Sequence, residues 1–401
     1  MSIVYKYRKS VFLLIVLVCI PILSINLVSA SIPNSFSVIE GQSHLGTGLP
    51  VQLIAKDNSV FENKGETTFE AKLFGIFPLK NVSINILPKM TLVPGGQTFG
   101  VKLFTEGVMV VGVSDIATAE GTKNPAVLAG IKTKDIILTV NGNKVNTIEE
   151  LTDIFEASDG KAIAIGLTRK GVAYKTEIQP VKSVTDGKFK VGLWVRDSTA
   201  GIGTLTFFEP KTGIFAGLGH GICDVDTGDI MPMMSGSVVN ADISGVIKGQ
   251  KGAPGELVGT FDESKTYGDL LGNSETGVYG VLNDSDSIKN QKAIQVAGQS
   301  EVKEGSAYIL SDVGDGVKQY NIEIVRIMRG AGYSSKNMLI KVTDPELIDK
   351  TGGIVQGMSG SPIIQNGKII GAVTHVLVND PTRGFGIFIE NMLDEMKKTK
   401  K

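Results

Sequence analysis

The stretch GIVQGMSGSPIIQNGKIIGAVTHV, residues 353–376, surrounds a Met-Ser-Gly-Ser tetrapeptide with glycines and continues into two apolar runs separated by Asn-Gly. Asn-Gly between apolar runs predicts a β-hairpin, so this segment is expected to form a tight loop and then two paired strands. The same tetrapeptide occurs at residues 234–237 without a preceding glycine or a following proline. Ser235 is therefore predicted to lie in a strand-edge turn. Ser359 is the candidate nucleophile, and a glycine turn without chemistry is its alternative.

The hexapeptide GMSGSP, residues 357–362, with its hairpin and returning strand, resembles the nucleophile segment of chymotrypsin-like serine peptidases. Glycines there allow a sharp backbone turn, and the resemblance implies that the N–H groups of Gly357 and Ser359 face the developing oxyanion. An α/β-hydrolase elbow requires Gly-x-Ser-x-Gly, but Ser361 occupies the last position. That class of hydrolase is therefore excluded.

A serine nucleophile needs a base, and the chain has 3 histidines. His220, in GIFAGLGHGICDVDTG, has glycine on both sides, which lets its backbone approach another segment closely, so it is the favoured general base over an ordinary turn histidine. His375 follows an apolar strand soon after Ser359; we expect it to pack at the strand end, and it is the second candidate base. His44 lies in a polar, glycine-bounded loop and is expected to be solvated.

Composition excludes several functions. A length of 401 residues suggests two to four domains, and 49 glycines with short Val/Ile/Thr runs predict a mainly β protein. The net charge of −1 and the lack of a long basic block exclude nucleic-acid binding. Cys19 and Cys223 cannot form a disulfide within the folded part, and Cys223 is expected to be a small buried residue, with a cysteine nucleophile as its rival interpretation. No metal-ligand spacing is present, and no cofactor is expected.

The N-terminus carries an export signal. Lys6, Arg8 and Lys9 precede an apolar stretch from Val11 to Val28, a pattern that leaves the basic end in the cytoplasm and exports the remainder of the chain. An uncleaved membrane anchor is the favoured interpretation. A signal cleaved after the small residues 28–30 and a buried soluble helix are the alternatives.

The chain divides into four regions. Residues 1–30 form the anchor, and residues 31–94 alternate apolar and polar positions, as in a small β module or an extended arm. Residues 95–182 change pattern and form a separate domain. Residues 183–401 have short strands and frequent glycine, which predicts an all-β barrel or sandwich, closed by a terminal helix.

The region 95–182 contains the strings Ala129-Gly130-Ile131, Asp135-Ile136-Ile137 and Val140-Asn141-Gly142. With these strings the region resembles a PDZ domain of the type found in exported bacterial proteases. Thr147 and Glu150 have capping-box spacing, which fixes the start of an amphipathic helix. The resemblance implies a groove between this helix and a strand, where a peptide adds as an extra strand and its terminal carboxylate meets backbone N–H groups. The matching carboxylate loop comprises Thr98, Phe99, Gly100 and Val101. A PDZ fold used as a spacer or for intramolecular docking is the alternative.

Together, the His220 and Ser359 motifs behind an anchor and a PDZ region resemble the stage IV sporulation protein B peptidases of endospore-forming bacteria. This resemblance covers essentially the whole chain and implies a double β-barrel with catalytic His220, Asp344 and Ser359. Asp344 would hold the imidazole in the correct tautomer. On chain spacing alone, carboxylates nearer to His220 are equally good candidates: Asp224, Asp226 and Asp229.

The resemblance also implies a function. The peptidase would cross the forespore membrane, stay tethered to it, and face the space between forespore and mother cell. There it would cut itself and cleave a membrane-bound inhibitor of the protease that processes the late mother-cell sigma factor precursor. A PDZ-bearing envelope adaptor with an inactive protease-like domain is the alternative. A housekeeping protease of the heat-shock type is disfavoured, because there the PDZ domain follows the protease domain.

Overall fold

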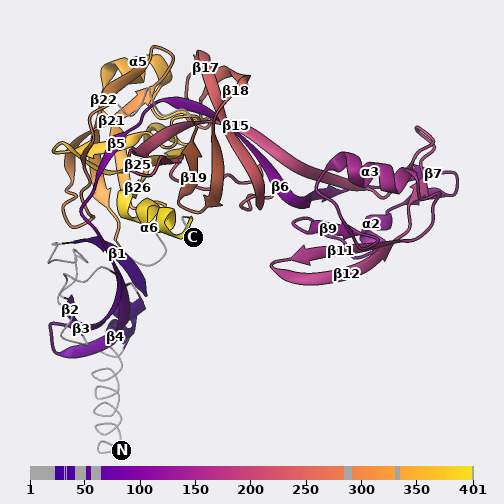
Figure 1. Ribbon diagram of the computed structural model, residues 1–401, viewed down its shortest axis with the longest axis horizontal. Helices are drawn as coiled ribbons and strands as arrows, with labels where there is room; N and C mark the ends of the chain where they lie inside the picture. Colours follow the sequence, from indigo (N-terminus) through magenta and orange to yellow (C-terminus); the bar gives the residue numbers. More distant parts are fainter. Residues whose placement is uncertain are drawn as a thin grey trace, which may run out of the picture.

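The computed structural model describes residues 23–399, apart from 31, 33, 41–50, 56–64, 284–290 and 330–334 (Figure 1). The protein is mainly β, as the sequence predicts. His44 and most of the proposed anchor lie outside the described residues, although residues 23–30 are described and are helical. No helix among the described residues is both long enough and apolar enough to cross a membrane.

A small four-stranded sheet follows the N-terminal segment, where a β module was expected. The strand order is β1-β4-β3-β2, and β1 runs parallel to β4. Alternating residues of β4, including Ile84 and Ile86, are buried against Phe69 of β3, which gives the sheet one apolar face. The strands are β1 (Ser35–Ile39), β2 (Val51–Ala55), β3 (Gly65–Leu73) and β4 (Phe77–Leu87).

The next strands form a closed barrel. Pairings run from β6 through β17, β18, β19, β16 and β15, and β15 pairs with β6 again to close the ring. Its interior is filled by residues such as Phe99, Leu218 and Phe215. The strands are β6 (Thr98–Val113), β15 (Leu193–Glu209), β16 (Ile214–Gly217), β17 (Met233–Ile247), β18 (Glu256–Ser274) and β19 (Gly277–Leu282). Beside β15 lies β5 (Thr91–Pro94), which in turn pairs with β20 (Ile294–Gln295).

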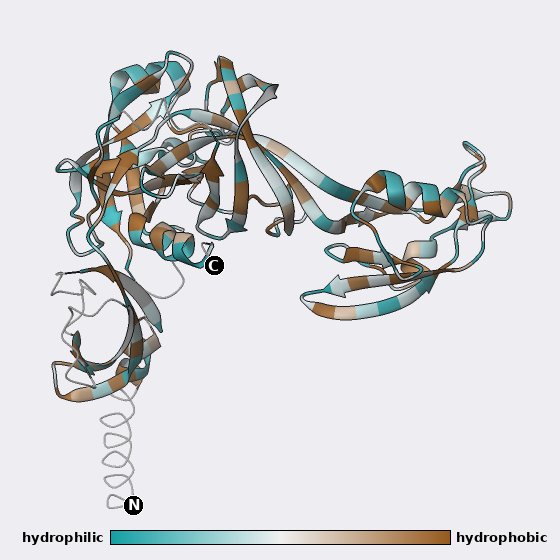
Figure 2. Cartoon of the chain, viewed as in Figure 1, coloured by the Kyte–Doolittle hydropathy of each residue, from teal (hydrophilic) through white to brown (hydrophobic). Residues whose placement is uncertain are grey.

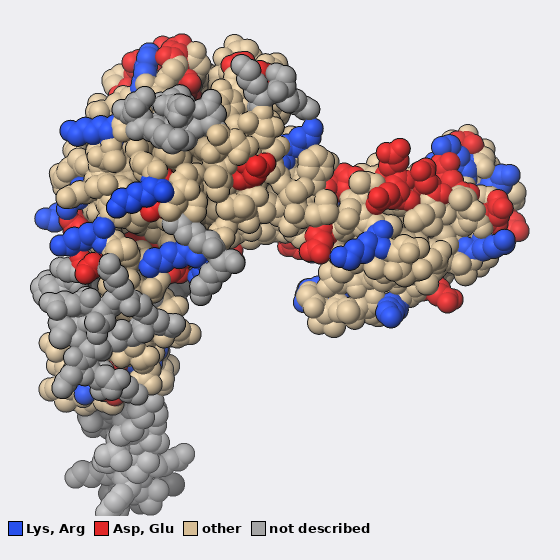
Figure 3. Space-filling model, viewed as in Figure 1, with Lys and Arg blue, Asp and Glu red and all other residues tan. Residues whose placement is uncertain are grey.

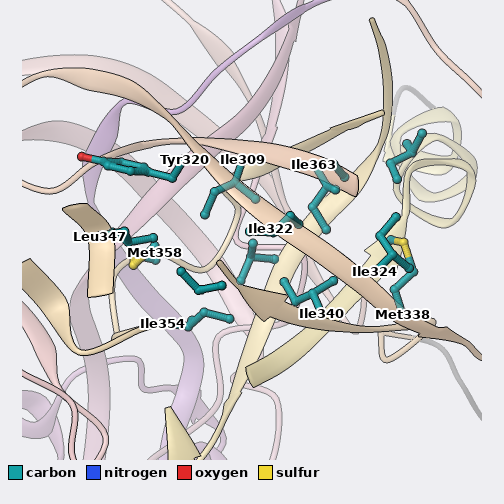
Figure 4. Packing of buried hydrophobic residues seen from close by; sticks show 14 of the residues in the cluster. Ile309, Tyr320, Ile322, Ile324, Met338, Ile340, Leu347, Ile354, Met358 and Ile363 are labelled. Carbon is teal, nitrogen blue, oxygen red and sulfur yellow. The ribbon is translucent and has the colours of Figure 1, made fainter. Parts of the chain in front are cut away.

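A second closed barrel, with strand order β21-β22-β23-β26-β25-β24, completes the double-barrel architecture. Its core is apolar, and Met358, adjacent to Ser359, packs in this core with Leu347 and Ile354 (Figure 4). The elements are β21 (Gly305–Asp312), β22 (Val317–Ile327), β23 (Met338–Val342), α5 (Pro345–Thr351), β24 (Pro362–Gln365), β25 (Lys368–Leu377), β26 (Asp380–Phe388) and the terminal helix α6 (Ile389–Thr399).

A PDZ-like unit is inserted between β6 and β15 and projects from the barrels (Figure 1). Its core contains residues from the strands and from both helices. The elements between the two long strands are β7 (Ile116–Thr118), β8 (Gly121–Lys123), α2 (Pro125–Leu128), β9 (Ile136–Val140), β10 (Asn143–Lys144), α3 (Ile148–Glu156), β11 (Ile163–Arg169), β12 (Val172–Ile178), β13 (Val181–Lys182) and β14 (Phe189–Lys190).

Helix α3 confirms the predicted capping box. The Glu150 N–H donates to the Thr147 hydroxyl at 3.1 Å, and the Glu150 carboxylate accepts from the Thr147 N–H at 3.2 Å. Leu151 and Phe155 are buried beneath the helix. Its outer face is polar in Figure 2 and carries a row of acidic side chains in Figure 3, whereas apolar residues concentrate on the barrel strands.

The long strands β6 and β15 belong to both units. Residues 98–104 of β6 pair with residues 198–204 of β15 in the barrel wall, and residues 109–113 pair with 193–196 in the PDZ-like unit. The double-barrel fold therefore starts before the PDZ-like unit and resumes after it. This arrangement differs from the predicted boundaries at 95 and 183, because one strand that serves two units looks like an ordinary strand in the sequence.

Candidate active site

Ser359 lies in a tight loop that runs from the core of the second barrel into β24. Gly357 and Gly360 have φ values of 97° and 99°, in the region that favours glycine. A Cβ on Gly360 would lie 2.0 Å from the carbonyl oxygen of Thr204 and 2.5 Å from the backbone nitrogen of Leu218. The glycine after the serine is thus required because the first barrel's backbone packs directly against this loop.

Two N–H groups of this loop are free. Within the described part of the chain, no hydrogen-bond partner is present for the backbone N–H of Gly357 or of Ser359. Each of these N–H groups shares its peptide group with a carbonyl that is hydrogen-bonded. Gln356 O, in the peptide of Gly357 N–H, accepts from Leu257 N at 2.9 Å, and Met358 O, in the peptide of Ser359 N–H, accepts from Ser361 N at 3.0 Å. Since C=O and N–H point in opposite directions in a trans peptide, these bonds orient both N–H groups away from their anchors. The arrangement suits an oxyanion hole, as the sequence resemblance implies.

Thr204 of β15 holds the loop from the other side. Its hydroxyl donates to Gly357 O at 2.7 Å, and its backbone N–H donates to Ser359 O at 2.9 Å. Thr204 is fully buried. Sequence reasoning did not identify this residue, because it lies far from Ser359 along the chain and no local pattern connects the two.

His220 follows β16 in a turn with left-handed backbone at Leu218 and Gly219, whose φ values are 65° and 67°. A Cβ on Gly219 would lie 2.9 Å from Cγ2 of Thr374, so the turn packs directly against β25 of the second barrel. Nδ1 of His220 is 2.9 Å from the carbonyl oxygen of Gly221. A carbonyl only accepts, so this bond places the proton on Nδ1 and leaves the Nε2 lone pair available as a base.

The histidine turn and the serine loop therefore meet between the two barrels. Leu218 lies against Gly360, and Gly219 lies against Thr374. The Ser359 hydroxyl donates to Thr374 O at 2.8 Å and makes no hydrogen bond to His220. A rotation of the serine side chain to another staggered position is needed before the hydroxyl can be donated to the imidazole.

The Asp344 carboxylate has hydrogen-bond partners other than His220. It is the N-cap of α5, where its carboxylate accepts from Glu346 N at 3.1 Å and from Leu347 N at 3.3 Å. Its second oxygen accepts from the backbone N–H of Asn321 at 3.1 Å. No hydrogen bond joins Asp344 to His220. The geometry therefore does not support a pairing of these two side chains, and Asp-Pro-Glu at 344–346 is the local signal of a helix start.

The nearer carboxylates are also engaged elsewhere. Asp224, whose side chain is 0% exposed, forms an ion pair with Arg196 of β15 at 2.7 Å. Arg196 also pairs with Asp226 at 2.7 Å, and Lys134 of the PDZ-like unit pairs with Asp229 at 2.8 Å. The loop after His220 is thereby tied to the inserted unit. None of these carboxylates hydrogen-bonds to His220.

The remaining candidate nucleophiles carry less support. The prediction that Cys223 is buried is wrong, because the residue is exposed. Partial desolvation of its thiol, and then the charge of Asp229, raises the pKa of that thiol, which disfavours the thiolate that a cysteine nucleophile requires. Ser235 lies in β17, paired with Phe104 of β6, and is part of the barrel wall. Among the described residues, no group of His, Cys, Asp and Glu side chains is arranged to hold a metal ion.

The predicted carboxylate loop of the PDZ region is part of β6. Thr98, Phe99, Gly100 and Val101 pair with β15 along one edge, and the last three also pair with β17 along the other. The structure therefore leaves no free strand edge at these residues for a peptide. Asp197 of β15 also accepts from Ile148 N at the start of α3 (2.8 Å), so the chain's own strand lies beside this helix.

The pKa values of both histidines near Ser359 are lowered by burial. Burial lowers the pKa of His220 below its ordinary value, and the Gly221 carbonyl partly opposes this shift. Burial, and then repulsion by His220 and Lys336, lowers the pKa of His375 to about 4. Both imidazoles are therefore neutral at neutral pH.

The chain matches one protein family and is similar to several solved structures. Residues 187–393 match the SpoIVB peptidase S55 family. The PDZ domain of an SdrC-like protein from Listeria monocytogenes is similar over 22% of this chain and 87% of that chain, with 20% identity and a TM-score of 0.20.

Two proteases are similar over about half of the chain. The HtrA-type protease AlgW, solved with a decapeptide, matches over 52% of this chain and 54% of its own, with 15% identity and a TM-score of 0.32. The serine endoprotease from Yersinia pestis matches over 50% of this chain and 57% of its own, with 14% identity and a TM-score of 0.28. The chain thus spans little more than half the length of either protease.

Proposed function

The chain belongs to the SpoIVB peptidase S55 family and is a serine peptidase, and we propose that it is an exported endopeptidase of sporulation that is tethered to the forespore membrane. It cuts itself and then cleaves a membrane-bound inhibitor of the protease that processes the late mother-cell sigma factor precursor. The apolar segment behind Lys6, Arg8 and Lys9 supports the tether. The substrate and the pathway rest on the sequence resemblance.

The observation that carries the proposed peptidase mechanism is the pair of free N–H groups at Gly357 and Ser359, next to an imidazole whose Nε2 is unprotonated. His220 Nε2 takes the proton of the Ser359 hydroxyl while Oγ attacks the scissile carbonyl. The two N–H groups then stabilise the oxyanion. The imidazolium returns the proton to the leaving amine, and a water molecule hydrolyses the acyl-enzyme by the same steps.

The proposed mechanism requires one rearrangement. The Ser359 hydroxyl must leave Thr374 O and turn toward His220. Binding of the substrate at Ser359 would supply that change by displacing the hydroxyl. In catalytic sites without substrate, the hydrogen bond between nucleophile and base is often loose and tightens only in the complex.

The test is expression of the full chain beside Ser359→Ala, His220→Ala and Ser235→Ala, followed by gel and mass analysis of self-cleavage products. Ser235 shares the tetrapeptide but lies in the barrel wall, so Ser235→Ala is the matched control. Fragments that disappear with the first two variants and persist with the control support self-cleavage. The same fragments in all four proteins would assign the cuts to host proteases.

One observation favours a second candidate function. The Ser359 hydroxyl is bound to Thr374 O and not to the base, as an adaptor with an inactive protease-like domain would permit. The two functions differ in the reactivity of Ser359. A chain that neither cuts itself nor reacts with a fluorophosphonate at Ser359 would be such an adaptor.

A further inference from the structure

The turn between β3 and β4 exposes large apolar side chains. Residues 73–79, LFGIFPL, contain no charged side chain, and Phe74, Ile76 and Phe77 are 62%, 71% and 53% exposed. Single exposed apolar residues are ordinary, but a run of them on a surface is unfavourable unless it serves a function. Such patches mark sites where a protein meets another protein or a membrane. These three side chains are called the hairpin tip below.

The backbone of this turn does not suit its sequence. The N–H of Ile76 donates to the carbonyl of Leu73 at 3.1 Å, and the two central residues, Phe74 and Gly75, have φ values of 53° and 72°. Positive φ at both central positions is characteristic of type I′ turns, which favour Asn-Gly. A bulky residue is uncommon in that conformation, because its Cβ crowds the backbone. Phe74 therefore stabilises neither the turn nor the core, which points to a role outside the folded chain.

The direction of β1 shows which end of the sheet carries the hairpin tip. Ser35, at the start of β1, pairs with Ser83, in the middle of β4, and the two strands are parallel. The residues before Ser35 therefore lie toward the beginning of β4, where Phe77 follows the turn. The N-terminal helical segment, residues 23–30, thus leaves the sheet at the end where the hairpin tip lies.

Contacts hold the N-terminal segment at this end of the sheet. Val28 and Ile32 belong to one apolar cluster with Ala71 of β3 and Leu79 of β4. Lys80 of β4 also donates a hydrogen bond to the carbonyl of Ile32. A strand rises about 3.3 Å per residue, so the hairpin tip lies only about 10 Å beyond these contacts along the strands.

The chain in front of this end is the apolar stretch from Val11 to Val28. The described part of this stretch exposes Leu23 and Leu27, at 61% and 63%. A bilayer that holds the stretch would therefore begin close to residues 23–30, on the side of the sheet that carries the hairpin tip. Phenylalanine and aliphatic side chains are favourable at the boundary between lipid headgroups and acyl chains. A lipid surface thus matches both the chemistry and the position of the hairpin tip.

We propose that the hairpin tip inserts into the lipid interface beside the N-terminal segment, so that the chain contacts the membrane at two points. The inference rests on the membrane tether in the proposed function. A single segment leaves the folded part free to turn about it, whereas a second contact fixes the orientation of the four-stranded sheet. Asn85, near the far end of β4, donates to Asp394 of α6, so the sheet is attached to the second barrel.

The length of β4 then sets the height of the barrels. This strand has 11 residues, so its far end, from which the chain continues into β5, stands no more than about 35 Å above the hairpin tip. Figure 1 shows the four-stranded sheet below the barrels, at one end of the molecule. The hairpin tip thus holds the barrels at a set distance from the lipid surface.

The experiment measures the depth of single tryptophans in vesicles of phosphatidylcholine and phosphatidylglycerol. The full chain carries Ser359→Ala, which keeps it uncut, and Trp194→Phe, which removes its 1 tryptophan. One tryptophan is then introduced per protein: Phe74→Trp at the hairpin tip, Leu23→Trp in the apolar stretch, or Val172→Trp as the matched control. Val172 is 69% exposed and directly follows a turn of the PDZ-like unit, which projects from the barrels (Figure 1).

The proposal predicts a specific pattern of quenching by brominated lipids. Phe74→Trp should be quenched at least about half as strongly as Leu23→Trp, because interfacial side chains lie within about 5–10 Å of the headgroup boundary. Val172→Trp should not be quenched by lipid and should remain open to iodide in the solvent. Ile76→Trp is a second reporter at the hairpin tip, at a position without positive φ, and should behave as Phe74→Trp does.

Three results would overturn the proposal. The first is lipid quenching of Leu23→Trp without quenching of either reporter at the hairpin tip, which would leave the tip as a site for a protein partner. The second is equal quenching of Val172→Trp and the hairpin tip, which would show general adsorption to the vesicles. The third is an absence of quenching in every protein, Leu23→Trp included. That result would also contradict the proposed tether, whereas the first would leave the tether intact.

Discussion

The hydroxyl of Thr204 in the first barrel donates a 2.7 Å hydrogen bond to the carbonyl of Gly357 in the second. The backbone N–H of the same threonine donates to Ser359 O at 2.9 Å. One buried residue thus holds the carbonyls of the two residues that flank Met358, whose side chain is anchored in the barrel core. The position of the candidate oxyanion donors therefore depends on the contact between the barrels.

The first prediction concerns this contact. Thr204→Val keeps the shape of the side chain and removes the hydroxyl, which leaves the buried Gly357 carbonyl without that donor. We expect a loss of about 1–3 kcal/mol in the free energy of unfolding, measured by urea denaturation, and a lower kcat with little change in KM. Thr204→Ser, which keeps a hydroxyl, should restore most of both. Equal stability of Thr204→Val and the parent would contradict the assignment.

The second prediction concerns the loop after His220. Arg196→Met leaves Asp224, with its side chain fully buried, without its ion-pair partner. Breaking a fully buried pair costs about 3–5 kcal/mol, and we expect about 2–4 kcal/mol here because Arg196 is 30% exposed. Lys134→Met removes the exposed pair with Asp229 and should cost less than about 1 kcal/mol. Thermal and urea unfolding of the three proteins measure the difference, and similar losses in both variants would contradict it.

The third prediction concerns pH. Burial lowers the pKa of His220, and the base works only when Nε2 is unprotonated. Activity should therefore rise with pH through a midpoint below about 6.5, the ordinary imidazole value. The acid limb of kcat/KM reports this group in the free enzyme. Self-cleavage rates across mildly acidic pH measure it, and a midpoint above neutrality would indicate a carboxylate partner instead.

The fourth prediction concerns stability at alkaline pH. Complete burial raises the pKa of Glu390, at the start of α6, to about 8. The folded chain therefore holds a proton that the unfolded chain releases above about 4.3. This contribution is complete at low pH and is lost as pH rises through about 8. Glu390→Gln should flatten the decline in unfolding free energy over that window while keeping an acceptor for Gln299 N–H, which donates at 2.7 Å. An unchanged pH slope in denaturation would disprove this.

Local patterns in the sequence predicted the parts of the site that depend on local backbone. The glycines around Ser359 and His220 occupy tight turns, and the capping box at Thr147 is formed as expected. Such features depend on a few adjacent residues and can therefore be predicted from a single sequence. The double-barrel class followed from a resemblance to a peptidase segment, not from strand counting.

Features that depend on distant pairing were not predictable in the same way. The sequence around Thr98 suits a PDZ carboxylate loop, but β15 and β17 pair with both edges of that strand. Asp344 was assigned by resemblance, although its Asp-Pro-Glu context is a local helix-start signal that the structure bears out. The bulge at Thr374 and the contact between His220 and His375 depend on the register between strands. No local sequence pattern predicts that register.

The division of the candidate site between the two barrels also decides when activity can arise. A ribosome synthesises the strands of the first barrel and His220 well before Ser359, and the serine loop hydrogen-bonds to β25, which is synthesised after it. Chains emerge from synthesis in N-to-C order and fold unit by unit. A nascent chain therefore lacks an assembled site until β25 has been made. A chain that stops before β25 therefore has no site in which a peptide bond could be cut.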